Sequence, residues 1–194
     1  QQNEPKGSKL VILHTNDTHS NIEAFPANHN KFPNRGGVAR RFSMIEEVRQ
    51  QNENVLLLDA GDIFQGTPYF NRYKGNLEMR LMSEMGYDVA TLGNHDFDIG
   101  IDGFMSAYKN ANFSFVNCNY DFGNTAMAQI IKPYTIIKKG KLKIGILGVG
   151  IELEGLAPLP CYDGILFRDP ILYANKYAAE LKEKGCDLII CLSH

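Results

Sequence analysis

The chain has 194 residues, 44% of them hydrophobic, with 20 basic and 22 acidic side chains and a formal net charge of -2. Such a composition is typical of one globular domain or part of a larger protein. Its near-neutral charge gives no reason to expect the broad basic surface that a nucleic-acid polymer requires. The apolar runs are strand-sized, so we predict no membrane span, and residues 1–9 are predicted to form a disordered polar leader.

Apolar runs of strand length alternate with segments of helical period along residues 10–194. This alternation is typical of a βαβ-wound sheet and predicts an α/β fold. In chain order we predict a buried strand beginning at Leu10, a helix at 36–52, a strand at 54–62, a helix through Leu77, Leu81 and Met85, a strand at 88–96, a short helix at 102–110, a strand at 113–120, two strands at 130–150 that turn at Lys139 and Gly140, a helix capped by Asp169 that ends at Gly185, and a strand at 187–194.

Side chains of the metal-ligand type follow four of the predicted strands. In open α/β sheets the ligand crevice lies outside the carboxyl ends of the strands, so we expect these residues to converge on one site. Carboxylate, amide and imidazole groups form a mixed oxygen and nitrogen set, which favours Zn, Mn or Fe over Mg or Ca. The residues are Asp17, His19, Asp62, Asn94, His95 and His194.

The motifs at these strand ends resemble those of the calcineurin-like metallophosphoesterases. They are NDTH at 16–19, GDIFQGT at 61–67, GNHDFD at 93–98 and the terminal LSH. More narrowly, they are similar to the catalytic, N-terminal domain of the 5'-nucleotidase and UDP-sugar hydrolase group, and the resemblance covers 10–194. It implies a four-layer αββα sandwich around a centre of two divalent metal ions, with Zn or Mn favoured and Fe an alternative.

The resemblance also implies a role for each candidate ligand. Asp62 matches the carboxylate that bridges the two metals, a role that its two oxygens allow. Asp17 and His19 match ligands of the first metal, and Asn94 and His194 match ligands of the second.

His95 and Asp98 match the catalytic residues of the family. His95 matches the residue that stabilises or protonates the phosphoryl transition state, and Asp98 matches the acid that orients this histidine and keeps it cationic. The implied reaction is in-line attack on phosphorus by a metal-activated water, without a covalent phosphoenzyme.

Two further polar residues near the motifs are predicted to have structural roles. Asp59 is expected to brace its loop through backbone hydrogen bonds rather than to bind metal. His14 lies inside the first strand and is expected to be a hydrogen-bonded core histidine, at most a support for a metal ligand.

The leading hypothesis is therefore a metal-dependent phosphoesterase that acts on nucleotides and releases phosphate from nucleoside 5'-monophosphates. The same centre would serve a 2',3'-cyclic nucleotide phosphodiesterase or a UDP-sugar hydrolase, and a non-catalytic binding module on this fold is the alternative outside enzymes. The implied partners are a small phosphoester substrate and a C-terminal nucleotide-recognition domain, without a nucleic-acid polymer.

The resemblance carries two further expectations. The family pattern continues with a Gly-His-x-His segment that supplies two more ligands, so we expect the domain to be truncated after His194 and each metal to lack a ligand in this chain. The group is commonly exported, which implies a periplasmic, cell-surface or secreted protein whose signal peptide has been removed. Four cysteines without a C-x-x-C pair do not fix the compartment.

Overall fold

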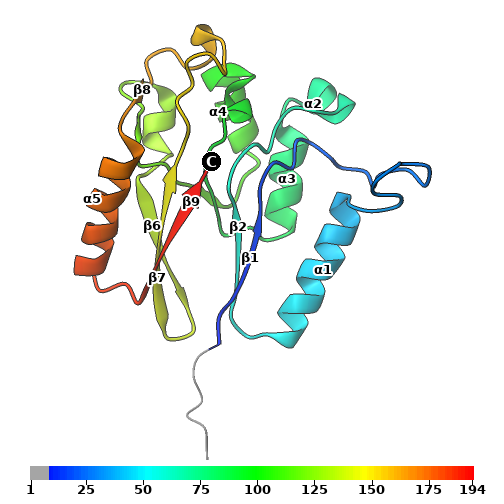
Figure 1. Ribbon diagram of the computed structural model, residues 1–194, viewed down its shortest axis with the longest axis horizontal. Coiled ribbons are helices and arrows are strands. Elements are labelled where there is room, and N and C mark those ends of the chain that lie inside the picture. Colours follow the sequence, from blue (N-terminus) through cyan, green and yellow to red (C-terminus); the bar gives the residue numbers. More distant parts are fainter. Residues whose placement is uncertain (1–8) are drawn as a thin grey trace, which may run out of the picture.

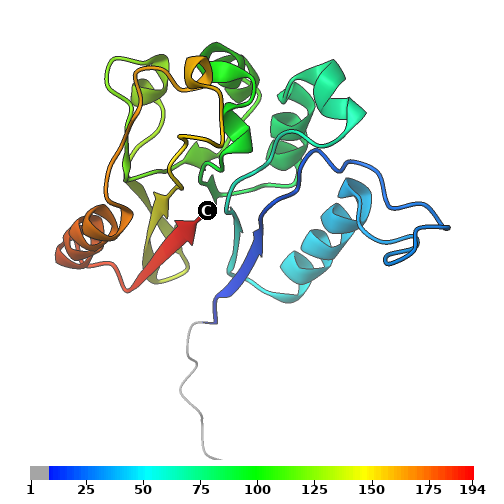
Figure 2. The ribbon, with the colours of Figure 1, turned by 45° about the horizontal axis from the view of Figure 1, so that its top comes forward.

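The computed structural model describes residues 9–194, so the leader predicted over 1–9 lies outside the described residues except for Lys9. Two β-sheets face each other, and helices cover the outer face of each (Figure 1). The turned view shows the same layers, with the carboxyl end of the chain between the two sheets (Figure 2). This arrangement confirms the predicted α/β fold and its αββα layering.

The first sheet is entirely parallel, in the order β1-β2-β3-β4. Its second strand is completely buried because both of its faces are covered. Leu57 packs into the cluster on the helical side, while Leu56 and Leu58 pack against the other sheet. The strands are β1 (Val11–Thr15), β2 (Val55–Asp59), β3 (Val89–Ala90) and β4 (Ser114–Phe115).

The second sheet has the order β6-β7-β9, with an antiparallel β6-β7 hairpin and a parallel β7-β9 pair. The hairpin turns at Gly140, whose φ of 58° suits glycine, and this confirms the predicted turn. Ile144 and Ile146 of β7 pack against the first sheet, whereas Leu147 packs on the helical side. The strands are β6 (Tyr134–Lys139), β7 (Leu142–Val149) and β9 (Leu188–Ser193), and a separate pair is formed by β5 (Tyr120–Asp121) and β8 (Leu166–Phe167).

Helices α1 and α3 lie outside the first sheet, and α5 lies outside the second (Figure 1). The predicted cap of α5 is confirmed, because Oδ1 of Asp169 accepts a hydrogen bond from the backbone N–H of Leu172 at 2.8 Å. The helices are α1 (Val38–Gln51), α2 (Pro68–Tyr73), α3 (Asn76–Glu84), α4 (Gly100–Tyr108) and α5 (Pro170–Glu183), and the 3-10 turns are η1 (His95–Phe97), η2 (Ala126–Gln129) and η3 (Leu159–Cys161).

The strands β3 and β4 are much shorter than predicted, with two residues each. After β3 the chain leaves the sheet to form η1, and only Thr91 continues the pairing by donating to the carbonyl of Asp59 at 3.0 Å. The apolar run that suggested a long strand is buried instead as part of a loop that leads into the site. The short helix α2 was not predicted from the sequence.

The first strand is also more exposed than predicted, and His14 is not a core residue. Strand β1 lies at the edge of its sheet and alternates between half-buried and exposed positions. Ile12 is 41% exposed and His14 on the same face is exposed as well.

Within residues 9–194 no helix has the length and apolar character needed to cross a bilayer, and all four cysteines are free thiols.

Candidate metal centre

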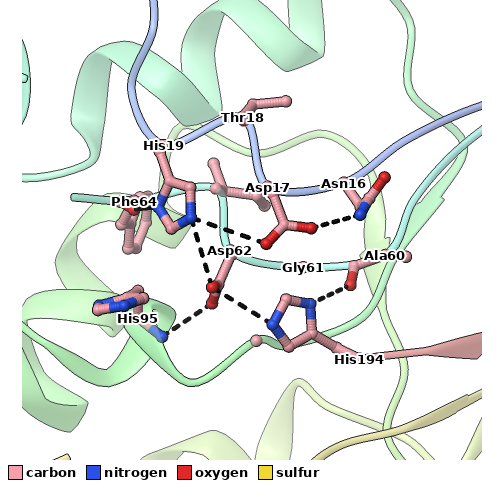
Figure 3. Close-up of polar contacts among 12 residues, drawn as sticks. Asn16, Asp17, Thr18, His19, Ala60, Gly61, Asp62, Phe64, His95 and His194 are labelled. Atoms are coloured by element: carbon pink, nitrogen blue, oxygen red, sulfur yellow. Dashed lines mark hydrogen bonds and ion pairs between the residues drawn. The ribbon is translucent and has the colours of Figure 1, made fainter. Parts of the chain in front are cut away.

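The loops that follow β1, β2 and β9 bring four predicted ligands together (Figure 3). Asp17 and His19 follow β1, Asp62 follows β2, and His194 follows β9. The first two strands belong to one sheet and β9 belongs to the other, so the cluster forms where the carboxyl ends of the two sheets meet.

Asp62 is the centre of this cluster. Its Oδ2 atom lies 3.6 Å from Nε2 of His19 and 3.3 Å from Nε2 of His194. The same nitrogen of His19 is 3.7 Å from Oδ1 of Asp17. Asp62 is buried, whereas Asp17 is exposed and also contacts the side-chain amide of Asn16. Two imidazoles therefore face one carboxylate oxygen from opposite sides.

Both imidazoles are oriented by backbone carbonyls. Nδ1 of His19 lies 3.1 Å from the carbonyl oxygen of Phe64, and Nδ1 of His194 lies 2.9 Å from that of Ala60. Because a carbonyl can only accept, Nδ1 carries a hydrogen in each ring and Nε2 is left for a ligand. This is the usual way in which proteins orient metal-binding histidines, so the donor set fits a divalent ion.

Ionisation in the cluster is coupled through Asp62. Burial opposes the charge of Asp62, but hydrogen bonds from His194 and His95 outweigh it and lower the pKa of this carboxyl. The hydrogen bond with Asp62, opposed by burial, raises the pKa of His194 to about 9. A proton on Nε2 of His194 would therefore compete with any metal ion that this nitrogen were to bind.

His95 faces the cluster from the turn η1. Its backbone N–H donates to Oδ1 of Asp62 at 2.9 Å, and its Nδ1 pairs with Oδ2 of Asp98 at 2.8 Å. The rings of His95 and His19 meet edge to face with centroids 5.3 Å apart. Burial opposes the imidazolium, but the hydrogen bond and charge of Asp98 raise the pKa of His95 above its ordinary value.

Asn94 lies directly before His95 and is half-buried. Its position at the start of η1 places it beside the cluster, although in the described part of the chain its side chain forms no hydrogen bond with the other candidate residues. The role of Asn94 as a ligand thus stays a prediction.

Asp96 organises the site and was not singled out from the sequence. Its completely buried carboxylate accepts backbone N–H bonds from Asp62 at 3.0 Å, Ile63 at 2.9 Å, Phe64 at 3.3 Å and Gly93 at 2.8 Å. Burial raises the pKa of Asp96 to about 6 although these bonds lower it. Its only sequence signal is its place within GNHDFD, and an acidic residue beside a histidine does not by itself predict a backbone clamp.

Two residues hold the loop that precedes Asp62. Asp59 accepts from the N–H of Gly61 at 2.9 Å and from the hydroxyl of Thr15 at 2.6 Å, which confirms its predicted bracing role. Gly93 packs so closely that a side chain there would overlap the Asp62 carboxylate. The loops after β2 and β3 are therefore fixed against each other.

This fold and this donor set define an α/β protein with a candidate metal centre at the ends of its strands. The family model described as calcineurin-like phosphoesterase matches residues 10–194, and the chain belongs to this family. Membership implies divalent metal ions, and Asp17, His19 and Asp62 form a group whose ligand atoms lie within 4.8 Å of one another.

Named relatives and solved structures agree with this assignment. The chain is 38% identical over 193 residues to a snake venom 5'-nucleotidase of Gloydius brevicauda. The matched region covers 96% of this chain and 33% of the relative. It is similar to a 5'-nucleotidase precursor of Thermus thermophilus, with a TM-score of 0.88, 35% identity and coverage of 95% and 37%. The NAD nucleotidase of Haemophilus influenzae has a TM-score of 0.82, 29% identity and coverage of 95% and 34%. The chain thus spans about a third of the length of these relatives.

Proposed function

We propose that this chain is the metal-binding catalytic domain of a phosphoester hydrolase that acts on nucleotides, with nucleoside 5'-monophosphates as its main substrates. The observation that carries the proposal is the position of Oδ2 of Asp62 within 3.6 Å of His19 Nε2 and 3.3 Å of His194 Nε2. The substrate class is supported by the names of relatives in Gloydius brevicauda and Thermus thermophilus.

The donor set supports two divalent ions that share Asp62. Asp17 and His19 would hold one ion with Asp62, while Asn94 and His194 would hold the other with it. Oδ1 of Asp62 already accepts from His95, so Oδ2 is the atom that faces both imidazoles. Mixed oxygen and nitrogen ligands favour Zn or Mn, with Fe as the third candidate.

Bound divalent ions would neutralise charge on an anionic phosphate and lower the pKa of the water that attacks phosphorus. The remaining chemistry belongs to side chains of this chain. His95 is held by Asp98 through Nδ1, which leaves Nε2 to donate to a substrate oxygen, and the raised pKa of His95 favours the protonated form that this donation needs. Asp98 orients the ring and keeps it cationic.

The rival activities share this centre and differ in the phosphoester that is cleaved. A 2',3'-cyclic nucleotide phosphodiesterase and a UDP-sugar hydrolase remain the alternatives, and the similarity to a protein named NAD nucleotidase favours including dinucleotides among the substrates tested. Base recognition is proposed to come from a C-terminal domain. Export to the periplasm or cell surface is proposed from the similarity to a venom protein.

The test is a substrate panel on the whole protein that contains this chain, after EDTA treatment and after return of Mn²⁺ or Zn²⁺. AMP, 2',3'-cyclic AMP, UDP-glucose, NAD and p-nitrophenyl phosphate are compared by kcat/KM. We expect AMP to be hydrolysed fastest and only with metal present. Metal binding without turnover of any of these esters would favour the non-catalytic binding module instead.

A further inference from the structure

Glu78 of helix α3 is 4% exposed, and neither oxygen of its carboxylate has a hydrogen-bond partner among residues 9–194. Ser20 is 2% exposed and its hydroxyl is likewise unpaired. Buried polar groups in folded proteins are nearly always hydrogen-bonded, so two unpaired groups in one place indicate a missing partner.

Both groups line the same small cavity. It has a volume of about 10 Å³, which is close to the space that the centre of one water molecule requires. Arg41 of α1 also lines the cavity, and among the described residues no hydrogen bond joins it to Glu78. The walls otherwise include apolar side chains such as Ile63 and Met82.

We propose that one buried water occupies this cavity and joins the Ser20 hydroxyl to the Glu78 carboxylate, and that Glu78 is thereby a positioning residue for the metal-ligand loop. The water accepts from Ser20 and donates to Glu78, which gives it the two to four polar partners that internal waters have. Arg41 also lines this cavity, and a cationic residue in its wall favours water over a cation as the guest.

The loop that the water secures is strained. Asp17, His19 and Ser20 all have positive φ values, at 51°, 44° and 52°, in a region that residues with a side chain rarely adopt. The backbone of Ser20 is already fixed, because its N–H donates to Ile63 at 3.0 Å and its carbonyl accepts from the Thr67 hydroxyl at 2.7 Å.

With its backbone fixed in this way, only the side chain of Ser20 can still move. Ser20 directly follows His19, the proposed metal ligand. A bridge to Glu78 would tie it to α3 and resist relaxation of the strained backbone. Its loss is expected to move Nε2 of His19 away from Oδ2 of Asp62. This inference rests on the proposed metal site and deepens it.

The experiment measures Mn²⁺ binding by titration calorimetry in the whole protein, together with the urea midpoint of unfolding. Glu78→Met replaces the carboxylate by an apolar group, and Ser20→Ala removes only the hydroxyl. We expect each to weaken Mn²⁺ binding by about tenfold, as is typical when the support of a metal ligand is lost. Glu78→Gln keeps an oxygen at the cavity and is expected to stay within about twofold of the unaltered protein.

Ser83→Ala is the matched control on the same helix. The Ser83 hydroxyl donates to the carbonyl of Asn110 at 2.8 Å and accepts from the N–H of Asn112 at 3.0 Å, away from the cavity. Its loss is expected to lower the urea midpoint without a change in Mn²⁺ affinity. If Glu78→Met and Ser20→Ala weaken Mn²⁺ binding no more than Ser83→Ala does, the positioning role is wrong.

A high-resolution crystal structure grown with RbCl identifies the guest. One water in contact with Ser20 and Glu78 supports the proposal, whereas a dry cavity or an anomalous Rb⁺ peak overturns it. Failure of the proposed function is a separate result, because in that case the unaltered protein itself would bind no Mn²⁺, and the inference would fall with it.

Discussion

The backbone N–H of His95 donates to Oδ1 of Asp62 at 2.9 Å. Together with the bonds that the Asp96 carboxylate accepts from the loop after β2, this bond joins the two loops that carry the most characteristic motifs of the chain. It leaves Oδ2 of Asp62 to face both His19 and His194. The proposed catalytic residue and the proposed shared ligand are thus fixed relative to each other by main-chain geometry. Changes at these two positions should nevertheless have different effects, because only Asp62 is proposed to offer a side-chain ligand to metal.

Asp62→Asn is expected to abolish metal binding and activity together. The substitution removes the negative charge that Nε2 of His19 and of His194 both face. We expect metal affinity and kcat/KM to fall by at least about 100-fold. Metal content and turnover of AMP are the measurements, and His14→Ala is the control, because His14 is exposed and its loss should change stability by less than about 0.5 kcal/mol. Full metal occupancy with near-normal turnover in Asp62→Asn would rule out the shared-ligand role.

His95→Asn is expected to keep the metal and lose turnover. The side chain of His95 pairs with Asp98 and is not among the groups that face Oδ2 of Asp62, so its removal should lower kcat by about 10²–10⁴-fold while metal content is unchanged. Simultaneous loss of metal and activity would instead identify His95 as a ligand.

The second arm of this test is Asp98→Asn. The hydrogen bond and charge of Asp98 raise the pKa of His95, so the amide should lower that pKa. If protonated His95 is the active form, the pH at which kcat falls on the alkaline side should shift downward in the variant. An unshifted pH profile would mean that Asp98 does not act through His95.

Asp96→Asn is expected to destabilise the folded chain. The amide would place a donor against backbone N–H groups that now point at a carboxylate, two on each oxygen. Buried groups that lose their partners cost about 2–4 kcal/mol in total, and the free energy of unfolding from urea titration should fall by this amount. A change of less than about 0.5 kcal/mol would show that the clamp contributes little.

Most of the helices and strands could be predicted because their signals are local. The α5 cap at Asp169 and the β6-β7 turn at Gly140 depend on neighbouring residues alone, and both are confirmed. The exposure of His14 could not be predicted in this way, because it depends on β1 being at the edge of its sheet. Strand order is a long-range property that a buried-looking apolar run does not reveal.

The candidate site follows the same division. Asp17, His19, Asp62 and His194 could be grouped because each follows a strand, and strand ends meet at one edge. Asp96 was missed because most of its partners are backbone N–H groups remote in sequence, which leave no pattern around it, whereas the partner of Asp59 lies two residues away. The orientation of the two imidazoles by backbone carbonyls could not be predicted from the sequence for the same reason.

Asp59→Asn is expected to flatten the dependence of stability on pH. Burial raises the pKa of Asp59 from 3.8 to about 7, although hydrogen bonds with Thr15 and Gly61 lower it. The folded chain therefore holds a proton that the unfolded chain releases, and this contribution to stability is complete below about pH 4 and is lost as the pH rises through about 7.

The amide of the Asp59→Asn variant is neutral at every pH and can still accept from Gly61 and donate to Thr15. Urea unfolding between about pH 5 and pH 8 should show that the variant loses less stability with rising pH than the unaltered chain does. Equal slopes for the two proteins would show that Asp59 is ionised throughout this range.

Divalent metal is expected to stabilise the folded protein, and to do so only through the Asp62 cluster. Carboxylates of Asp17 and Asp62 lie 3.7 and 3.6 Å from Nε2 of His19, so two negative groups converge on one imidazole and an added cation relieves their repulsion. At a free metal concentration about 100 times Kd, binding to the folded state adds about 2.7 kcal/mol to the free energy of unfolding.

Thermal unfolding in EDTA and with added Mn²⁺, Zn²⁺, Mg²⁺ or Ca²⁺ measures the effect. Mn²⁺ and Zn²⁺ should raise Tm more than Mg²⁺ and Ca²⁺, because imidazole nitrogen is a poor ligand for the latter pair. The increase should vanish in Asp62→Asn, and an undiminished increase in that variant would place the bound metal elsewhere in the protein.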